Sequence, residues 1–298
     1  MVEKALEIGK TIRPAVSIGG SVASFYDGTV SLTCGHICAQ STAWESEPLT
    51  KGLKLVVVDN SELLCKLPNC EKTRIVGPCI CAIWNESDCE GMQSFPTGSR
   101  MQFTAISLSA STVKDRLPTA FERLSDASKG ASGPSLAVTS ASAAVRALCA
   151  QVGACPLRGL SRTLYLSGKA LEIAAHALDS LQATPSNAKD LHLSTADIEK
   201  LQHARDILTA RMRQPPSLAE LGQSVGLNPR KLTVGFRRVF GDSVFGYLQS
   251  AKLDAAYRLL VEGEMSVSCA AYSVGYSPAH FSVAFRKKFG VSPKQVCL

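Results

Sequence analysis

Two groups of residues could do chemistry, and they lie towards opposite ends of this 298-residue chain. Near the N-terminus, Cys34, His36 and Cys38 are two residues apart, and Cys65 follows. Because zinc prefers thiolate and imidazole ligands, these four residues form a candidate metal site. Free cysteine is also among the most buried residue types, so a set of inert core thiols is the alternative interpretation.

The second group is basic and lies in the last third of the chain. From Lys200 onward there are 14 Lys and Arg residues against 6 Asp and Glu, whereas the rest of the chain is nearly neutral. This excess of positive charge attracts phosphate. Arg230 could donate two parallel hydrogen bonds to guanine, whereas Ala279 and Val283 could make only apolar contacts, for example with the methyl group of thymine.

A sequence repeat with an offset of 49 residues positions these side chains. Its matching segments are Val225-Gly226-Leu227-Asn228-Pro229 with Val274-Gly275-Tyr276-Ser277-Pro278, Phe236-Arg237 with Phe285-Arg286, and Phe240-Gly241 with Phe289-Gly290. We therefore expect two copies of one small structural unit.

Each copy predicts a helix-turn-helix, in which a tight turn joins a short helix to a second helix. Glycine suits the turn because it takes left-handed conformations at little cost, and Asn or Ser followed by Pro is typical of a helix start. The expected parts are residues 218–225 and 267–274 for the first helix, Gly226 and Gly275 for the turn, Asn228 and Ser277 for the N-cap, and Pro229 and Pro278 for the first position of the second helix.

The second helices carry apolar residues four apart, which we expect to face inward. Outward positions could contact base edges near the start of each helix and phosphates further along. These candidate DNA-binding residues are Arg230, Lys231, Thr233, Val234, Arg237 and Arg238 in the first copy, and Ala279, His280, Ser282, Val283, Arg286 and Lys287 in the second. A helix expected over 244–262 joins the copies, and its length of about 28 Å suits the ~34 Å between successive major grooves.

The N-terminal half predicts a β-rich domain followed by helices. Short β-branched segments separated by turn sequences are typical of a barrel or sandwich. The expected strands cover residues 53–58, 63–67, 75–84 and 101–108, and the expected helices cover 143–149 and 161–182. The predicted fold class is α+β. We expect a ligand-sensing domain over 1–183, with a cupin-like barrel or sandwich to about 110 and a helical extension over 111–182. A linker over 184–194 and an all-α DNA-binding domain over 195–298 should follow.

Two features of the N-terminal domain could serve binding. Trp44 and Trp84 could stack on a flat aromatic ligand, although a tryptophan in a β domain is often a core residue. In the last expected helix, Leu164, Leu171 and Leu178 recur every seven residues. This stripe could form a homodimer interface or pack on the β domain, and a repeat this short does not decide between them.

The C-terminal domain resembles that of the AraC/XylS family of bacterial transcription regulators over about residues 195–296. The segments that carry this resemblance are the closing Phe289-Gly290-Val291-Ser292-Pro293 and the two helix-turn-helix copies. Within the family, the chain is most similar to regulators of the pyochelin type, through Asn228-Pro229-Arg230-Lys231-Leu232-Thr233, Val244-Phe245-Gly246-Tyr247-Leu248 and Gly275-Tyr276-Ser277-Pro278-Ala279-His280-Phe281. The N-terminal part is similar more loosely, through Glu47-Pro48-Leu49, Gly52-Leu53-Lys54-Leu55 and Tyr165-Leu166-Ser167-Gly168-Lys169-Ala170-Leu171-Glu172.

The resemblance implies a transcription regulator that is not an enzyme and needs no cofactor. Its N-terminal domain would bind a small-molecule effector, a ferric siderophore. Its C-terminal domain would bind double-stranded promoter DNA and, through RNA polymerase, activate genes for siderophore biosynthesis and uptake. The chain has no apolar run as long as a signal peptide or a membrane span needs, so we expect a cytoplasmic protein without membrane contact.

Two alternatives start from the cysteines. Cys34, Cys38 and Cys65 also resemble the thiols of Ada-type regulators, which hold zinc and accept methyl groups from damaged DNA. The interval from Cys65 to Cys70 is wide for a second ligand pair of that kind. The other alternative is a regulator that senses metal or redox state through its thiols.

Overall fold

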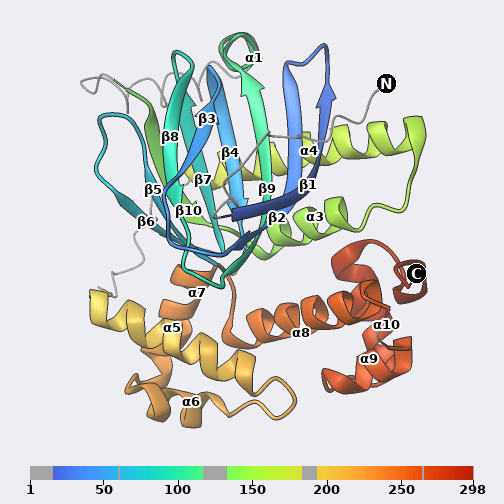
Figure 1. Cartoon of the computed structure of the whole chain (residues 1–298). Coiled ribbons are helices and arrows are strands. Elements are labelled where there is room, and N and C mark those ends of the chain that lie inside the picture. The colour runs from blue at the N-terminus through green and yellow to red at the C-terminus, as the bar shows by residue number, and fades with distance from the viewer. Residues whose placement is uncertain (1–15, 60, 117–132, 183–192, 264, 298) are drawn as a thin grey trace.

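The computed structural model describes residues 16–59, 61–116, 133–182, 193–263 and 265–297. Within these ranges, an N-terminal β sandwich with covering helices is followed by a helical C-terminal domain (Figure 1). The predicted α+β fold class is confirmed. Residues 184–192 of the predicted linker lie outside the described residues.

Two antiparallel sheets form the N-terminal domain. The large sheet has the strand order β1-β2-β9-β4-β7-β10, and the small sheet has the order β3-β8-β5-β6. Their strands are β1 (Val16–Phe25), β2 (Val30–Ala39), β3 (Glu45–Leu49), β4 (Gly52–Val58), β5 (Glu62–Lys66), β6 (Thr73–Val76), β7 (Cys79–Asn85), β8 (Cys89–Ser94), β9 (Arg100–Ser109) and β10 (Ser135–Ser140).

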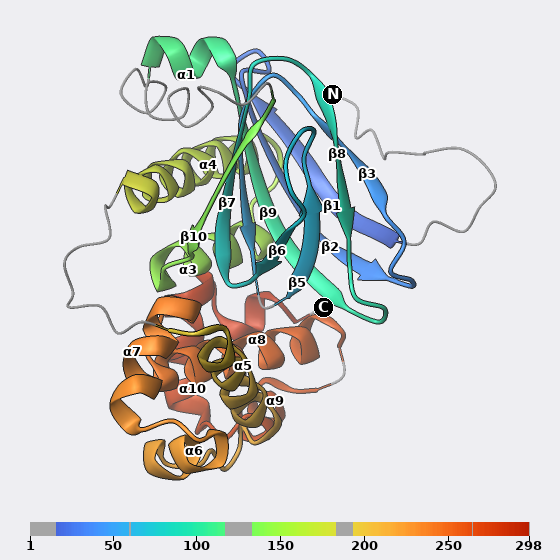
Figure 2. The same ribbon diagram turned by 90° about the vertical axis from the view of Figure 1, so that its left-hand side faces the viewer.

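Both faces of the large sheet are covered, which explains why its central strands are apolar at consecutive positions. On β7, Ile80, Ala82 and Trp84 pack towards the helices, whereas Cys79, Cys81 and Ile83 pack towards the small sheet. Because side chains alternate along a strand, one strand serves two hydrophobic cores. The resulting order of layers is helices, large sheet, small sheet (Figure 2).

Three sequence predictions for this domain need correction. The segment 75–84 is not one strand, because the chain leaves β6 at Val76 and enters β7 at Cys79. The expected run of helix over 111–182 is wrong at β10, which pairs with β7 at the edge of the large sheet. Strands β1, β2, β3 and β8 lie in segments rich in Ser, Gly and Glu, for which the sequence predicted no strand.

The helices α1 (Ala110–Arg116), α3 (Ala143–Gly153) and α4 (Gly159–Gln182) belong to the N-terminal domain. On α4, Ala170, Ile173 and Ala177 are fully buried against the large sheet. The predicted leucine stripe divides, because Leu178 joins this core whereas Leu164 and Leu171 are 64% and 44% exposed.

The C-terminal domain contains α5 (Thr195–Ala210), α6 (Leu218–Val225), α7 (Pro229–Phe240), α8 (Val244–Val261), α9 (Val267–Ser273), α10 (Pro278–Phe289) and a short final turn of 3-10 helix (Pro293–Gln295). The helices expected for both copies of the repeat are confirmed. Each copy has its own hydrophobic core, and α8 contributes one end to each core. None of the helices in the described ranges combines the length and apolar character that a membrane crossing requires.

Candidate nucleic-acid interface

The first helix-turn-helix is built by hydrogen bonds that its sequence specifies. Gly226 has φ of 65°, and the N–H of the next residue, Leu227, donates to the Gly222 carbonyl at 2.9 Å. The side-chain oxygen of Asn228 then accepts from the N–H of Lys231 at 2.7 Å. This cap and Pro229 start α7 directly after the turn, as the sequence predicts.

The second copy repeats the turn but not the cap. Gly275 has φ of 77°, and the N–H of Tyr276 donates to the Ala271 carbonyl at 2.9 Å. Ser277 occupies the N-cap position with extended backbone, yet its side chain makes no capping hydrogen bond. The prediction of a side-chain cap is therefore correct for Asn228 and wrong for Ser277.

Aromatic packing fixes which face of each second helix points outward. In α7, Leu232, Phe236 and Phe240 are fully buried, and the rings of Phe236 and Phe240 both contact Tyr247 of α8 at centroid distances of 5.5 Å. Burial raises the pKa of Tyr247. The inward face predicted for α7 is confirmed.

The inward face predicted for α10 is also confirmed. Phe281 and Phe285 are fully buried, Phe289 is buried, and the rings of Phe285 and Phe289 stack on Tyr257 of α8. The two cores therefore have the same design, with one tyrosine of α8 closing each.

Most of the candidate DNA-binding side chains lie on the opposite faces. The exposed ones are Arg230, Val234, Arg237 and Arg238 on α7, and Ala279, His280, Ser282, Val283, Arg286 and Lys287 on α10. Thr233 is half-buried, and its hydroxyl donates to the Pro229 carbonyl at 2.8 Å, as that of Ser282 does to Pro278 at 2.9 Å. The two faces are thus equivalent in position and different in chemistry.

Lys231, by contrast, is half-buried and pairs with an acidic side chain. Its ammonium lies 2.7 Å from the carboxylate of Asp197, which also accepts hydrogen bonds from Ser194 at the start of α5. Hydrogen bonds from Lys231 and Ser194 hold the pKa of Asp197 well below its ordinary value. This ion pair ties α5 to the first turn of α7.

Two further lysines support the turns, and the repeat did not reveal them. Lys200 of α5 donates to the Gly226 carbonyl at 3.3 Å, and Lys252 of α8 lies over the ring of Tyr276 beside Gly275. Burial lowers the pKa of Lys252. These lysines are 52 residues apart, so an alignment at an offset of 49 does not pair them.

The candidate ligand residues of the N-terminal domain differ in access. Trp84 is 1% exposed in the core between the large sheet and the helices, so this tryptophan is a core residue. Trp44 is 39% exposed, and the ammonium of Lys72 lies 5.5 Å from the centroid of its ring. Of the two, only Trp44 offers a ring face at the surface.

The four candidate metal ligands do not come together. Cys34, His36 and Cys38 share the helix-side face of β2, where Cys34 packs on the core of the helices. Cys65 lies on β5 in the core between the two sheets, on the other side of β2. In the described part of the chain, no three His, Cys, Asp or Glu side chains are grouped so that they could hold a metal ion.

Comparisons with known proteins agree with this geometry. Residues 221–297 match the family described as a helix-turn-helix domain, and residues 37–195 match the regulatory protein PchR N-terminal domain. The fold and the outward faces of α7 and α10 define a DNA-binding transcription regulator of the AraC type.

Its family follows from the relatives. The chain is 40% identical to the regulatory protein PchR of Pseudomonas aeruginosa over 241 residues, which are 81% of each protein. The chain belongs to the PchR family of regulatory proteins. The HTH-type transcriptional regulator GlxA of Rhizobium meliloti is 31% identical over 33% of this chain and 28% of its own length. A solved AraC-type regulator from Chromobacterium violaceum, 25% identical, covers 35% of this chain and 93% of its own, with a TM-score of 0.33.

The unequal caps lead to a stability prediction. Asn228→Ala should destabilise the protein by about 1 kcal/mol because an N–H of α7 loses its acceptor. Ser277→Ala should lower the free energy of unfolding by no more than a few tenths of that amount, since no capping hydrogen bond is lost. Urea denaturation of the two variants beside the wild type measures both effects. Equal losses would contradict the difference in capping.

Proposed function

We propose that this protein is an effector-controlled activator whose α7 and α10 read successive major grooves of promoter DNA. The observation that carries the proposal is the pair of exposed, equivalent helix faces held outward by buried aromatic rings. The linker helix α8 has 18 residues and is therefore ~27 Å long, close to the separation of two successive grooves.

In this proposal the two helices have different tasks. Arg230, one residue after Pro229 at the start of α7, is exposed and suited to a bidentate contact with guanine. At the position equivalent to Arg230, α10 presents Ala279, and Val283 lies one turn further along; both suit contact with thymine methyl groups. Arg237 on α7, with Arg286 and Lys287 on α10, would contact phosphates. The first helix would discriminate between sequences more sharply than the second.

The division between base and phosphate contacts can be measured with one promoter. Arg230→Ala should weaken binding by ~1–3 kcal/mol and relax the preference at one base pair. Arg286→Ala should weaken binding to all sequences alike and reduce the slope of log affinity against log salt by about 1. Arg158→Ala is the control, because this exposed arginine precedes α4 in the N-terminal domain. Undiminished sequence preference in Arg230→Ala would contradict its proposed role.

The proposed effector is a ferric siderophore, and the genes controlled are those of siderophore biosynthesis and uptake. The proposal rests on membership of the PchR family over both domains. Activation through RNA polymerase and action in the cytoplasm are parts of the same proposal. Among the aromatic side chains, Trp44 supports it most directly, since its ring is partly exposed beside a cationic lysine that could attract an anionic chelate.

Tryptophan fluorescence tests the effector. Ferric pyochelin should quench the wild type in a saturable titration, and Trp44→Phe, which retains the buried Trp84, should lose most of that signal. Zinc and haem are the comparison ligands. Absence of saturable quenching by ferric pyochelin and other ferric siderophores would remove the siderophore from the proposal and leave DNA binding untouched.

We also propose that the protein forms a homodimer through α4. This helix leaves Leu160, Leu164 and Leu171 exposed on a surface that nothing in the described chain covers. Apolar residues at this spacing could pack against the same helix of a second copy.

Sedimentation velocity measures the proposed association. Leu164→Glu combined with Leu171→Glu should convert the dimer to a monomer, because two charges would be buried in its interface. Leu157→Glu, at an exposed leucine just before α4, is the matched control and should remain dimeric. A monomeric wild type at tens of micromolar would overturn the proposal.

A further inference from the structure

Helix α3 belongs to the N-terminal domain but lies against the C-terminal domain. Both views place it between the large sheet and the helices of the C-terminal domain (Figures 1 and 2). One side of the helix packs on the sheet through Val145, Leu148 and Val152. This helix of 11 residues also contacts the C-terminal domain.

At the start of α3, the chain contacts the end of the first recognition helix. Gly241 ends α7 in the left-handed conformation, with φ of 68°. Its Cα approaches the backbone so closely that an added Cβ would overlap the carbonyl oxygen of Ala141. Ala141 is fully buried and its N–H donates to the Pro78 carbonyl at 3.1 Å, which fixes this point to the large sheet.

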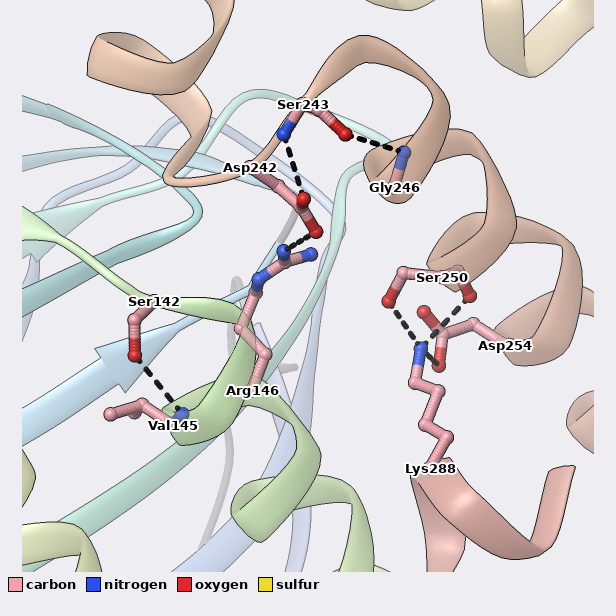
Figure 3. Close-up of polar contacts among 9 residues, drawn as sticks. All are labelled: Ser142, Val145, Arg146, Asp242, Ser243, Gly246, Ser250, Asp254 and Lys288. Atoms are coloured by element: carbon pink, nitrogen blue, oxygen red, sulfur yellow. Dashed lines mark hydrogen bonds and ion pairs between the residues drawn. The ribbon is translucent and has the colours of Figure 1, made fainter. Parts of the chain in front are cut away.

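An ion pair lies beside this contact. The guanidinium of Arg146 donates to the carboxylate of Asp242 at 2.7 Å, and the arginine side chain is only 6% exposed (Figure 3). The other oxygen of Asp242 accepts from the N–H of Ser243 at 2.7 Å, and the Ser243 hydroxyl caps α8 by accepting from Gly246. Arg146 is thereby connected to the junction at which α7 ends and α8 begins.

At the end of α3, the chain contacts the second recognition helix. Ala154 is buried in the core of the second copy together with Phe285 and Phe289 of α10. Gly290 ends α10 with φ of 73°, and a Cβ added there would lie 3.4 Å from the side chain of Gln151. The buried contact at this end, made by Ala154, is apolar.

These two contacts occur at equivalent points of the internal repeat. Gly241 and Gly290 are 49 residues apart, and each directly follows the last residue of a recognition helix. The segment 141–154, which consists of α3, about 16 Å long, and the residues that flank it, thus contacts the same position in both copies.

We propose that α3 is a bridge that fixes the separation and angle of the two recognition helices, and that Arg146 is a positioning residue for DNA recognition. The proposal rests on the proposed reading of two grooves. The contacts lie at the C-terminal ends of α7 and α10, so the exposed positions at their N-terminal ends stay open to DNA. A bridge of this kind raises the affinity for DNA with two correctly spaced elements, because the second helix is already in place when the first has bound.

A pair of glycine variants isolates the bridge. Gly241→Ala and Gly263→Ala each place a side chain in the left-handed region, but only the first meets the N-terminal domain, because no atom lies within 4 Å of a Cβ on Gly263. The probe is a duplex selected from random DNA by the full-length wild type, together with its derivative in which the element contacted by α10 is scrambled. The ratio of the two affinities measures the benefit of the second element.

We expect this ratio to fall on the order of tenfold in Gly241→Ala and to stay at the wild-type value in Gly263→Ala. The double variant Arg146→Met with Asp242→Asn should lower the ratio as well, and the Asn oxygen can still accept from Ser243. Because the double variant removes both charges, it leaves no unpaired buried charge and should fold. It therefore tests the bridge even if Gly241→Ala fails to fold.

Each other outcome has one meaning. An unchanged ratio in both bridge variants, or an equal loss of affinity for both duplexes, would overturn the bridge. A rise in affinity for the two-element duplex would overturn it too, because α3 would then hold the helices in a position unfavourable for DNA. If the wild type itself shows no preference for the two-element duplex, the proposed reading of two grooves fails instead.

Discussion

The burial of aromatic rings away from water determines which faces of α7 and α10 the C-terminal domain exposes. In α7 and α10, apolar side chains four residues apart occupy one face, and a tyrosine of α8 closes each core. A helix held this way cannot rotate without exposing Phe236 or Phe285. The chemistry of the opposite face can therefore change while its direction stays the same, as the contrast between Arg230 and Ala279 illustrates.

Between the domains, polar and apolar contacts have different consequences. Burying Arg146 carries a desolvation penalty that its pair with Asp242 largely offsets, so the pair contributes more to orientation than to net stability. Ala154, at the other end of α3, packs without any directional bond. The contact with the first copy therefore includes a directional polar bond, whereas the contact with the second copy through Ala154 is non-directional packing.

Local rules in the sequence predicted the C-terminal domain almost to the residue, because Gly226, Asn228 and Pro229 act within a few residues of themselves. The ion pair of Lys231 with Asp197 escaped prediction because its partners come from different helices. In the N-terminal domain, β1 and β2 lack a strong apolar alternation, and their pairing depends on partners distant in the sequence. The candidate zinc ligands fail for a similar reason, because the order of Cys34 and Cys65 along the chain does not reveal that they pack into different cores on opposite sides of β2.

Helix α3 is shared by two hydrophobic cores, one on each side of the predicted linker. A chimaera that joins the effector domain of one family member to the DNA-binding domain of another would take α3 from one parent and Gly241 and Gly290 from the other. Such an exchange keeps the connectivity of the chain, but the contact surfaces of the two domains then come from different parents and no longer fit each other. Substitutions on the exposed faces of α7 and α10 leave this surface unchanged, whereas substitutions at Gly241 or Gly290 alter its fit to the segment that contains α3.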